Sequence, residues 1–410
     1  MNKRKIVYIS KYALTPANAF SGRQFFMSKN FSLQGYRTIL ISSFSCGFST
    51  DLNDYTRKNN GVFYKMYDTL EHFLIPGKEI KLGFNFKRMF TWIQFELRLF
   101  RFLKNIVLHK NDVIIVSSLS LLTIINGIII KRKTGCNLVF EVRDIWPLTL
   151  IDIGGMSRFN PFILFLSLIE KIGYNYADLI VGTMPGLNLH VNSRIRKKFE
   201  FLYIPMGFDE NSYGENSSVS HKNTNKEGKF VACYAGAIGK VNRVDDILKA
   251  ASIIEKLDAI VYFRIIGSGP LLEKLKSQYK KLSNVEFMPW LSKSDLKSEL
   301  LNADLLLHPV PKQKIYRFGI SPNKWIDYMQ SGKPILVAYE GHNTILHEAN
   351  CAIFCSPENP ESIAQGVLDI KNKDISELVS LGSNGRDFLI QRLNYKVLSK
   401  KFIDKVEELF

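Results

Sequence analysis

Short apolar segments alternate with longer amphipathic ones along almost the whole chain of 410 residues, and this alternation constrains the fold more than any other feature. A strand followed by a helix and another strand is the pattern of parallel α/β architecture. The alternation is interrupted once. Residues 210–228 are rich in Asn, Ser, Lys and Gly and contain few large apolar side chains, which is the composition of a linker.

The sequence therefore predicts two doubly wound, Rossmann-like domains. We expect an N-terminal domain over residues 1–208, a linker over 209–228, a second domain over 229–384, and a C-terminal helix over 385–410 that returns to the first domain. The expected strands are residues 6–9, 38–41, 113–116, 138–142 and 179–181 in the first domain, and 230–234, 261–266, 285–287, 305–307, 335–337 and 352–354 in the second. Ligands of such sheets bind beyond the carboxyl ends of the strands.

The formal net charge is +17, which fits a nucleic acid, an anionic membrane surface or a phosphorylated substrate. No nucleic-acid-binding module is recognisable, so we expect no nucleic-acid partner. The five scattered cysteines favour reduced thiols and a cytoplasmic protein over a disulfide framework. Residues 113–130 are uncharged and as long as a membrane span, but they divide into a strand, a turn and a helix that Gly135 ends. The apolar run at residues 6–9 is too short for a signal peptide.

Two glycine-containing loops follow expected strands of the second domain. Residues 234–240 have the sequence Tyr-Ala-Gly-Ala-Ile-Gly-Lys, and residues 264–270 contain a Gly-Ser-Gly-Pro turn. Glycine lets the backbone approach a ligand closely, and helix N-termini favour anions. The residues expected to hold a diphosphate here are Gly236, Gly239, Lys240, Arg243, Gly267 and Gly269. The alternative is a pair of ordinary tight turns with solvated basic side chains.

Residues 318–334 carry the strongest motif. Ser321 suits a helix N-cap and Pro322 the first helical position, while Gly332 suits the end of the helix. Lys324 and Asp327 are expected on one face, where the cation neutralises phosphate and the carboxylate accepts hydrogen bonds from ribose hydroxyls. The expected donor contacts are Ile320, Ser321, Pro322, Asn323, Lys324 and Asp327. The alternative is an ordinary surface helix.

Charged residues also follow an expected strand of the first domain, in the sequence Glu141-Val-Arg143-Asp144-Ile-Trp146-Pro. Polar side chains at the carboxyl end of a buried strand are placed for an active site. The alternative is a structural salt bridge between Arg143 and either Asp144 or Glu141.

Together these residues resemble glycosyltransferase family 4, which comprises retaining enzymes of the GT-B fold. The resemblance covers nearly the whole chain. It rests on the Gly22 region, residues 204–209, 234–240, 267–270, Ala303-Asp304 and 321–334. Residues 143–147 and the Ser-Pro-Asn-Lys sequence are similar to a bacterial branch that assembles O-antigen and capsule, often with N-acetylated aminodeoxy sugars.

The resemblance implies transfer from a UDP-sugar to a polyprenyl-diphosphate-linked saccharide, with no metal and no cofactor. It makes Asp144 and Arg143 the catalytic candidates and places Gly22, Arg23 and Trp146 on the acceptor side. The chain departs from the family where Gly319 replaces the first of two glutamates, and where Ala237 and Asn242 replace a phosphate-binding Arg and Lys; Lys240 and Arg243 are expected to substitute. The alternatives are a sugar-nucleotide epimerase of the same fold and a non-catalytic sugar-nucleotide-binding subunit.

Residues 84–107 interleave large aromatic and aliphatic side chains with Lys and Arg, and Glu96 is the single acidic residue among them. Such a composition is typical of a helix that lies on an anionic membrane surface. The apolar positions cover more than one helical stripe. We therefore expect peripheral association with the inner membrane. The alternative is a core helix with a basic solvent face.

Overall fold

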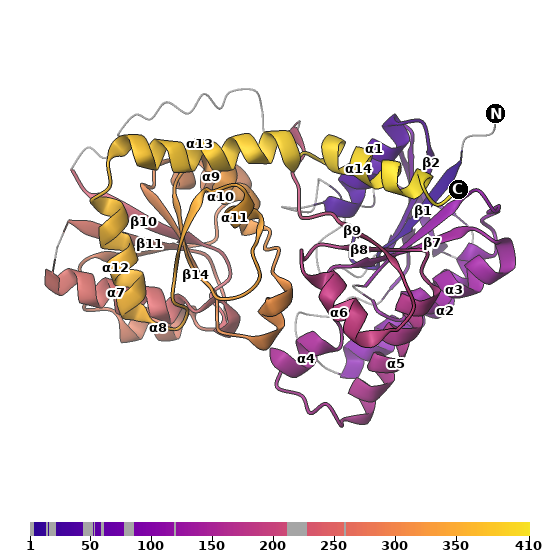
Figure 1. The fold of residues 1–410 in the computed structure, drawn as a ribbon, viewed down its shortest axis with the longest axis horizontal. Coiled ribbons are helices and arrows are strands. Elements are labelled where there is room, and N and C mark those ends of the chain that lie inside the picture. Colours follow the sequence, from indigo (N-terminus) through magenta and orange to yellow (C-terminus); the bar gives the residue numbers. More distant parts are fainter. Residues whose placement is uncertain are drawn as a thin grey trace. The chain divides into compact units, whose positions relative to one another are not determined.

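The computed structural model describes residues 4–13, 15, 22–43, 52, 54–58, 61–77, 86–118, 120–210, 228–257 and 260–410, with the backbone alone at 86–89. The chain forms two compact units (Figure 1). Unit 1 comprises Met1–Asp209 and Leu393–Phe410, and unit 2 comprises Glu210–Arg392. Most of the expected linker, residues 211–227, lies outside the described residues.

Unit 1 is built on a nine-stranded sheet in the described part of the chain, with the order β3-β4-β5-β2-β1-β6-β7-β8-β9. Its strands are β1 Lys5–Ile9, β2 Arg37–Ser43, β3 Thr56–Arg57, β4 Phe63–Tyr67, β5 Leu70–Ile75, β6 Val113–Ser117, β7 Asn137–Val142, β8 Leu179–Gly182 and β9 Glu200–Tyr203. The pairs from β5 through to β9 are parallel, and β4 pairs antiparallel with both β3 and β5. Strand order reverses at β1, so the carboxyl ends of β1 and β6 form a switch point.

Helices cover both faces of this sheet. They are α1 Arg23–Leu33, α2 Phe86–Leu103, α3 Thr123–Thr134, α4 Leu148–Asp152, α5 Pro161–Tyr176, α6 Leu187–Arg194 and α14 Tyr395–Glu407. On one face α1 packs against α14, where the rings of Phe31 and Phe402 lie 5.0 Å apart. On the other face α3 sits so close to the sheet that a Cβ at Gly127 would lie 2.8 Å from the Leu138 side chain.

The uncharged stretch at residues 113–130 divides as expected into β6 and α3. Gly135 ends α3 in the left-handed conformation with φ of 74°, which glycine adopts without a Cβ clash. Within the described ranges, no helix has both the length and the apolar character needed to cross a bilayer.

Unit 2 contains a second sheet, with the order β12-β11-β10-β13-β14-β15 and parallel pairing throughout its described strands. The strands are β10 Phe230–Ala235, β11 Val261–Ile266, β12 Val285–Met288, β13 Leu305–Pro309, β14 Ile335–Ala338 and β15 Ala352–Cys355. The helices are α7 Val244–Leu257, α8 Leu272–Gln278, α9 Lys293–Leu301, α10 Lys324–Ser331, α11 Ile345–Glu348, α12 Pro360–Lys371 and α13 Ile375–Arg392. The strand order again reverses at the first strand, so β10 and β13 flank the switch point.

Every strand expected from the sequence is present, and the predicted pair of doubly wound α/β sheets is confirmed. The expected border at residue 384 falls inside α13, and the border between the units lies at residue 392 instead. The final segment is therefore two helices rather than one, because α13 stays with unit 2 and α14 packs on unit 1.

Candidate functional site

The two glycine turns of unit 2 interlock at the carboxyl ends of β10 and β11. Ile238 donates its backbone N–H to the Ser268 carbonyl at 2.8 Å. Gly267 has φ of 147°, and a Cβ there would lie 1.9 Å from the Gly236 carbonyl oxygen. Gly269 is equally tight, since its Cβ would lie 2.4 Å from the Ile238 carbonyl oxygen. Larger residues at these two positions would push the loops apart, so both glycines are required by the backbone.

Gly236 also has a positive φ, of 149°, but its neighbour is a side chain. A Cβ there would lie 2.8 Å from the Nζ of Lys324, so the glycine leaves room for that ammonium group. Gly239 is different: its φ is −131°, and an added Cβ would find an atom of Asn242 at 3.9 Å, an ordinary contact. Of the glycines expected to cradle phosphate, Gly236, Gly267 and Gly269 are therefore shaped for close approach and Gly239 is not.

Lys324 brings a positive charge to these turns. Its Nζ donates to the Tyr234 hydroxyl at 3.1 Å and lies 4.3 Å from the centre of the Tyr234 ring. The hydroxyl in turn donates to the Ala237 carbonyl at 2.7 Å. Within the described part of the chain, no carboxylate pairs with Lys324, and burial lowers the pKa of its ammonium group to about 7. A half-buried cation without an anionic partner is a place where a bound anion gains free energy.

Arg243 is already engaged with acidic side chains. Its guanidinium donates to both carboxylate oxygens of Asp246, at 2.7 and 2.9 Å, and Asp246 is 1% exposed. Arg243 has a left-handed backbone with φ of 45°, and its guanidinium lies 3.9 Å from Glu358. The bidentate pair fixes the turn before α7 and leaves little of Arg243 for a phosphate. Lys240, on the same turn, is exposed.

Helix α10 begins later than the sequence predicts. Its first residue is Lys324, the N-cap is Asn323, and no side chain caps it, so the expected capping role of Ser321 and Pro322 is wrong. Gly332 ends the helix in the left-handed conformation with φ of 65°, as expected. Ile320 through Asn323 form the loop that enters the helix.

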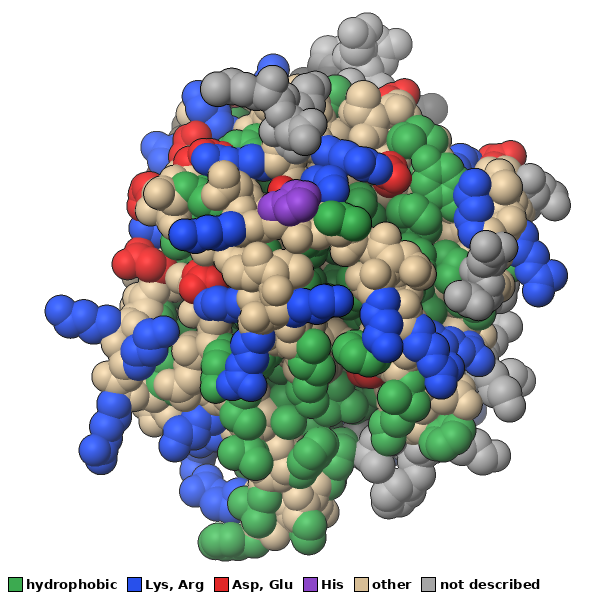
Figure 2. All heavy atoms as spheres, turned by 90° about the vertical axis from the view of Figure 1, so that its right-hand side faces the viewer, with side chains coloured by type: hydrophobic (Ala, Val, Ile, Leu, Met, Phe, Trp, Pro, Cys, Tyr) green, Lys and Arg blue, Asp and Glu red, His purple; other side chains and the backbone are tan. Residues whose placement is uncertain are grey.

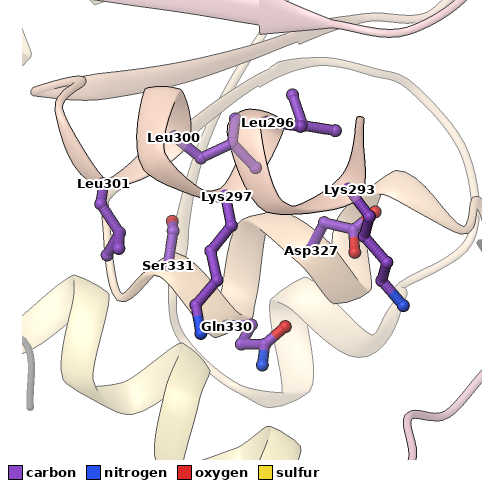
Figure 3. A pocket seen from close by; sticks show the side chains of 8 residues that line it. All are labelled: Lys293, Leu296, Lys297, Leu300, Leu301, Asp327, Gln330 and Ser331. Carbon is purple, nitrogen blue, oxygen red and sulfur yellow. The ribbon is translucent and has the colours of Figure 1, made fainter. Parts of the chain in front are cut away.

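Asp327 and Lys324 face different neighbours. Asp327 lines a groove between α9 and α10, beside Lys293 at one end of it (Figure 3). Lys324 instead reaches the Tyr234 hydroxyl. The groove is lined by Lys293, Leu296, Lys297, Leu300, Leu301, Asp327, Gln330 and Ser331. Both Asp327 and Lys293 belong to the first turns of their helices, near the carboxyl edge of the sheet.

In unit 1, Arg23 and Glu141 form a buried ion pair with an Nε–Oε1 distance of 2.9 Å. Arg23 also donates to the backbone carbonyls of Ile204 and Pro205 and is 1% exposed. Burial raises the pKa of Glu141, but Arg23 and Arg143 outweigh it and hold the pKa below its usual value. In the structure this side chain ties α1 to the segment after β9, and its expected place on the acceptor side stays a prediction. Gly22 is buried at the start of α1.

Arg143 and Asp144 follow β7, and neither side chain forms an ion pair with a described residue. Among the described residues, Arg143 pairs with neither Asp144 nor Glu141; one terminal nitrogen lies 3.8 Å from the Met206 sulfur, and its Nε has no partner. Asp144 is exposed. These two polar groups lie at the carboxyl end of β7 and are not used to hold the fold together.

An aromatic cluster stands next to them. Trp146 meets Trp92 edge to face, with the ring centres 5.5 Å apart, and the Trp92 Nε1 donates to the Tyr12 hydroxyl at 2.9 Å. Trp92 is 3% exposed, while Trp146 and Tyr12 are half-buried. The sequence singled out Trp146 alone, because Tyr12 and Trp92 come from distant segments. Over the ranges that the structure describes, no three His, Cys, Asp or Glu side chains are grouped to hold a metal ion.

Comparison with known proteins assigns the second half of the chain. Residues 216–388, all within unit 2, match the family model Glycosyl transferases group 1. Unit 2 is therefore similar to group 1 glycosyltransferase domains. The chain is also 21% identical over 309 residues to "Probable glycosyltransferase WbjE" of Pseudomonas aeruginosa, an alignment that covers 73% of this chain and 76% of WbjE.

Solved structures show the fold of the whole chain. Sucrose-phosphate synthase from Thermosynechococcus elongatus superposes with a TM-score of 0.72 at 13% identity, over 100% of this chain and 99% of that one. HepE from Anabaena, solved in complex with UDP, gives 0.66 at 13% identity, over 99% and 100%. These neighbours have the GT-B fold, so the prediction of a GT-B fold for this chain is confirmed.

Proposed function

We propose that this chain is a retaining glycosyltransferase that moves a sugar from a nucleotide-sugar donor to a lipid-linked saccharide. One observation supports the proposal most: among the described residues the Lys324 ammonium group has no carboxylate partner, and it lies beside two interlocked glycine turns in the unit that matches the group 1 glycosyltransferase model. A diphosphate matches this arrangement, because its negative charge would pair with the Lys324 ammonium group and its oxygens can approach the backbone at Gly236.

The donor that we propose is a UDP-sugar. The neighbour HepE was solved in complex with UDP. In this chain the N-terminal end of α10, which also carries Lys324, contains Asp327, whose carboxylate would accept hydrogen bonds from the ribose hydroxyls. The exposed Lys240 and the loop of residues 320–323 would complete the diphosphate contacts. No metal and no cofactor enter this scheme, because cationic side chains would stabilise the leaving diphosphate directly.

The acceptor residues that we propose lie in unit 1. Asp144 and Arg143 are polar groups at the end of β7 that form no ion pair with a described residue, and Trp146 offers an aromatic face of the kind on which sugar rings stack. Tyr12 and Trp92 hold that ring in place through the edge-to-face contact and a hydrogen bond. The acceptor hydroxyl would attack the anomeric carbon on the face from which the nucleotide departs, and the leaving phosphate oxygen would take the proton.

The proposed biological setting is cell-surface polysaccharide assembly. A polyprenyl-diphosphate-linked saccharide of O-antigen or capsule type, with an N-acetylated aminodeoxy sugar as the transferred group, fits the sequence resemblance. In this setting the protein is cytoplasmic and peripherally attached to the inner membrane, where its acceptor would lie.

The test uses labelled sugar nucleotides, with and without a lipid-linked acceptor, together with the variant Asp144→Asn. Wild type should transfer label to the acceptor, whereas Asp144→Asn should bind UDP with unchanged affinity in calorimetry and transfer at least ~10²-fold more slowly. Wild-type turnover in the variant would remove Asp144 from the site. A change of sugar configuration without an acceptor would instead indicate the epimerase.

Gly319 keeps one other candidate open, a non-catalytic sugar-nucleotide-binding subunit. Its φ of 87° is a conformation that residues with a Cβ rarely adopt, so the family's glutamate would be strained at this position. UDP-sugar binding without any transfer or isomerisation, over a panel of donors and acceptors, would favour that candidate.

A further inference from the structure

We propose that the outer face of α2, α3 and α5 is the surface by which this protein docks on an anionic lipid bilayer. The inference rests on the proposed function only for its setting, a lipid-linked acceptor; the evidence for the surface itself comes from packing and charge. It also adds a helix to the contact, because α5, which the sequence does not single out, contributes as many exposed apolar side chains as the described part of α2.

The three helices form one layer on unit 1. Helix α3 packs against α2 on one side and α5 on the other, and its inner side rests on β6 and β7. Gly173 of α5 lies so close that a Cβ there would be 3.0 Å from both Ile124 and Phe140, so α5 is pressed onto α3 and the sheet. The layer therefore has an inner face that the core covers and an outer face that no other described element of unit 1 covers.

The outer face carries large apolar side chains that are 38–80% exposed. They are Phe90, Ile93 and Leu97 on α2, Ile125 and Ile129 on α3, Leu164, Phe165 and Leu168 on α5, and Phe159 just before α5; we call this set the apolar face. Single exposed apolar residues need no explanation, but eight of them on three adjacent helices, with Phe159 next to α5, are a contiguous patch of the kind that marks an interaction site. Figure 2 shows hydrophobic side chains gathered in the lower part of one side of the molecule, in the region of α5, with Lys and Arg side chains above them.

Helix α2 shows how its two faces are divided. Trp92, Phe95, Leu99 and Leu103 are at most 3% exposed and belong to the core. Phe90, Ile93 and Leu97 follow each other at helical spacing on the opposite side, and Arg101 and Lys104 continue the same stripe. The side chains of residues 86–89 lie outside the described part of the helix. The core prediction for this segment is thus confirmed on one side of the helix, and the other side carries the apolar and basic side chains on which the membrane prediction rests.

The exposed charged side chains on the outer face of these three helices are all basic. The three helices contain two acidic residues, and both are turned inward: Glu96 accepts hydrogen bonds from Ser120, Thr123 and Asn126, and Glu170 is 2% exposed beside His190 and Arg194. Basic side chains, in contrast, are exposed around the apolar face. They are Arg98, Arg101, Lys104, Arg132, Lys133, Arg158 and Lys171.

This combination matches a bilayer better than a second protein. An interface with a protein would bring carboxylates among the rim charges to pair with the partner's cations, and none is exposed on the described residues of these helices. An anionic bilayer offers apolar tails for the apolar face and a uniformly negative surface for its basic rim. Each exposed cation near such a surface adds to binding, and the effect weakens with salt.

The test is co-sedimentation of the full chain with vesicles of phosphatidylethanolamine and phosphatidylglycerol, at low and high salt, beside vesicles of phosphatidylcholine. The variant Leu164→Gln/Phe165→Gln/Leu168→Gln should lower the partition coefficient on anionic vesicles at least ~10-fold. Its matched control is Leu33→Gln/Leu189→Gln/Ile375→Gln, which changes three exposed apolar residues elsewhere and should partition like wild type.

The charge variant is Arg101→Gln/Lys104→Gln/Lys133→Gln. It should bind anionic vesicles about 100-fold more weakly at low salt. Its matched control is Lys274→Gln/Lys280→Gln/Lys281→Gln, three exposed lysines of unit 2, and it should bind as wild type does. UDP affinity and thermal melts of all four variants should equal those of wild type, which separates this result from any failure of the donor site.

Three results would overturn the inference. One is wild type that fails to sediment with anionic vesicles. Another is equal loss of binding in the α5 variant and its control. The last is a wild-type dimer in sedimentation velocity that the α5 variant abolishes, since a second copy of the chain would then be the occupant of the apolar face. None of these touches the donor-site proposal, which calorimetry with UDP tests separately.

Discussion

Replacing Lys324 by Met should weaken UDP binding and remove its pH dependence. The ammonium group has Tyr234 as its polar contact and no carboxylate partner among the described residues, so the variant loses mainly the interaction with the bound diphosphate. A charge-assisted hydrogen bond contributes about 1.5–3 kcal/mol, which corresponds to a roughly 10- to 150-fold higher Kd. The variant should also melt at a higher temperature than wild type near neutral pH, because a buried charge has been removed.

The pH dependence is the sharper part of this prediction. Burial lowers the pKa of Lys324 to about 7, so about half of the free protein carries the charge at about pH 7 and about 3% at about pH 8.5. The bound diphosphate favours the charged form, so binding takes up a proton. Since the neutral form binds roughly 10- to 150-fold more weakly, the Kd of wild type should rise about 5- to 15-fold over this interval. The terminal phosphate of UDP, with a second pKa of about 6, is mostly ionised at about pH 7 and contributes little to the change.

Titration calorimetry in two buffers of different protonation enthalpy measures both the Kd and the proton uptake. The variant Lys324→Arg is the control, because its guanidinium stays charged over the whole interval and its Kd should not change with pH. A wild-type Kd that is constant over the same interval, or a Lys324→Met variant that binds as tightly as wild type, would refute the assignment of Lys324 to the phosphate site.

Two further predictions concern buried charges of unit 1. Arg23→Met should destabilise the protein by about 3–5 kcal/mol in urea unfolding, because it leaves Glu141 buried without its closest partner, and Arg23→Met/Glu141→Leu should recover most of the loss; equal stability of single and double variants would contradict this. Burial raises the pKa of Glu96 to about 7, so the folded protein holds a proton that the unfolded chain releases, and wild-type stability should fall between about pH 5 and about pH 8. The melting temperature of Glu96→Gln should lack this fall, and parallel pH profiles of the two proteins would count against it.

The sequence predicts the parallel strands well because each is a short apolar run between polar turns. It misses β3, β4, β5 and β9, which are mixed in polarity. Strands β3, β4 and β9 are partly or fully exposed, and β5 is largely buried although it contains Glu71 and His72. Of the residues proposed for the donor site, Gly236, Gly267 and Lys324 stand out by motif, since backbone conformation and charge are local properties.

Sequence patterns do not show which side chains contact one another in the fold. Arg243 looks like a phosphate ligand until Asp246 is seen beneath it, and Arg23 looks available until its pairing with Glu141, 118 residues away, is known. Trp92 and Trp146 meet across 54 positions, and no periodicity in either segment predicts that contact. Which side of α10 faces the glycine turns likewise depends on how the helix packs on the sheet.

The late position of α14 in the chain has a consequence for synthesis. Tyr395, Leu398, Phe402 and Val406 of α14 are part of the core of unit 1, yet the ribosome makes them after all of unit 2. At roughly 5–20 residues per second, synthesis of unit 2 and α14 takes roughly ten to forty seconds, and during this time unit 1 lacks the helix that packs against α1. Unit 2, which is continuous in sequence, can finish first, so the N-terminal half of this protein is the last to be completed.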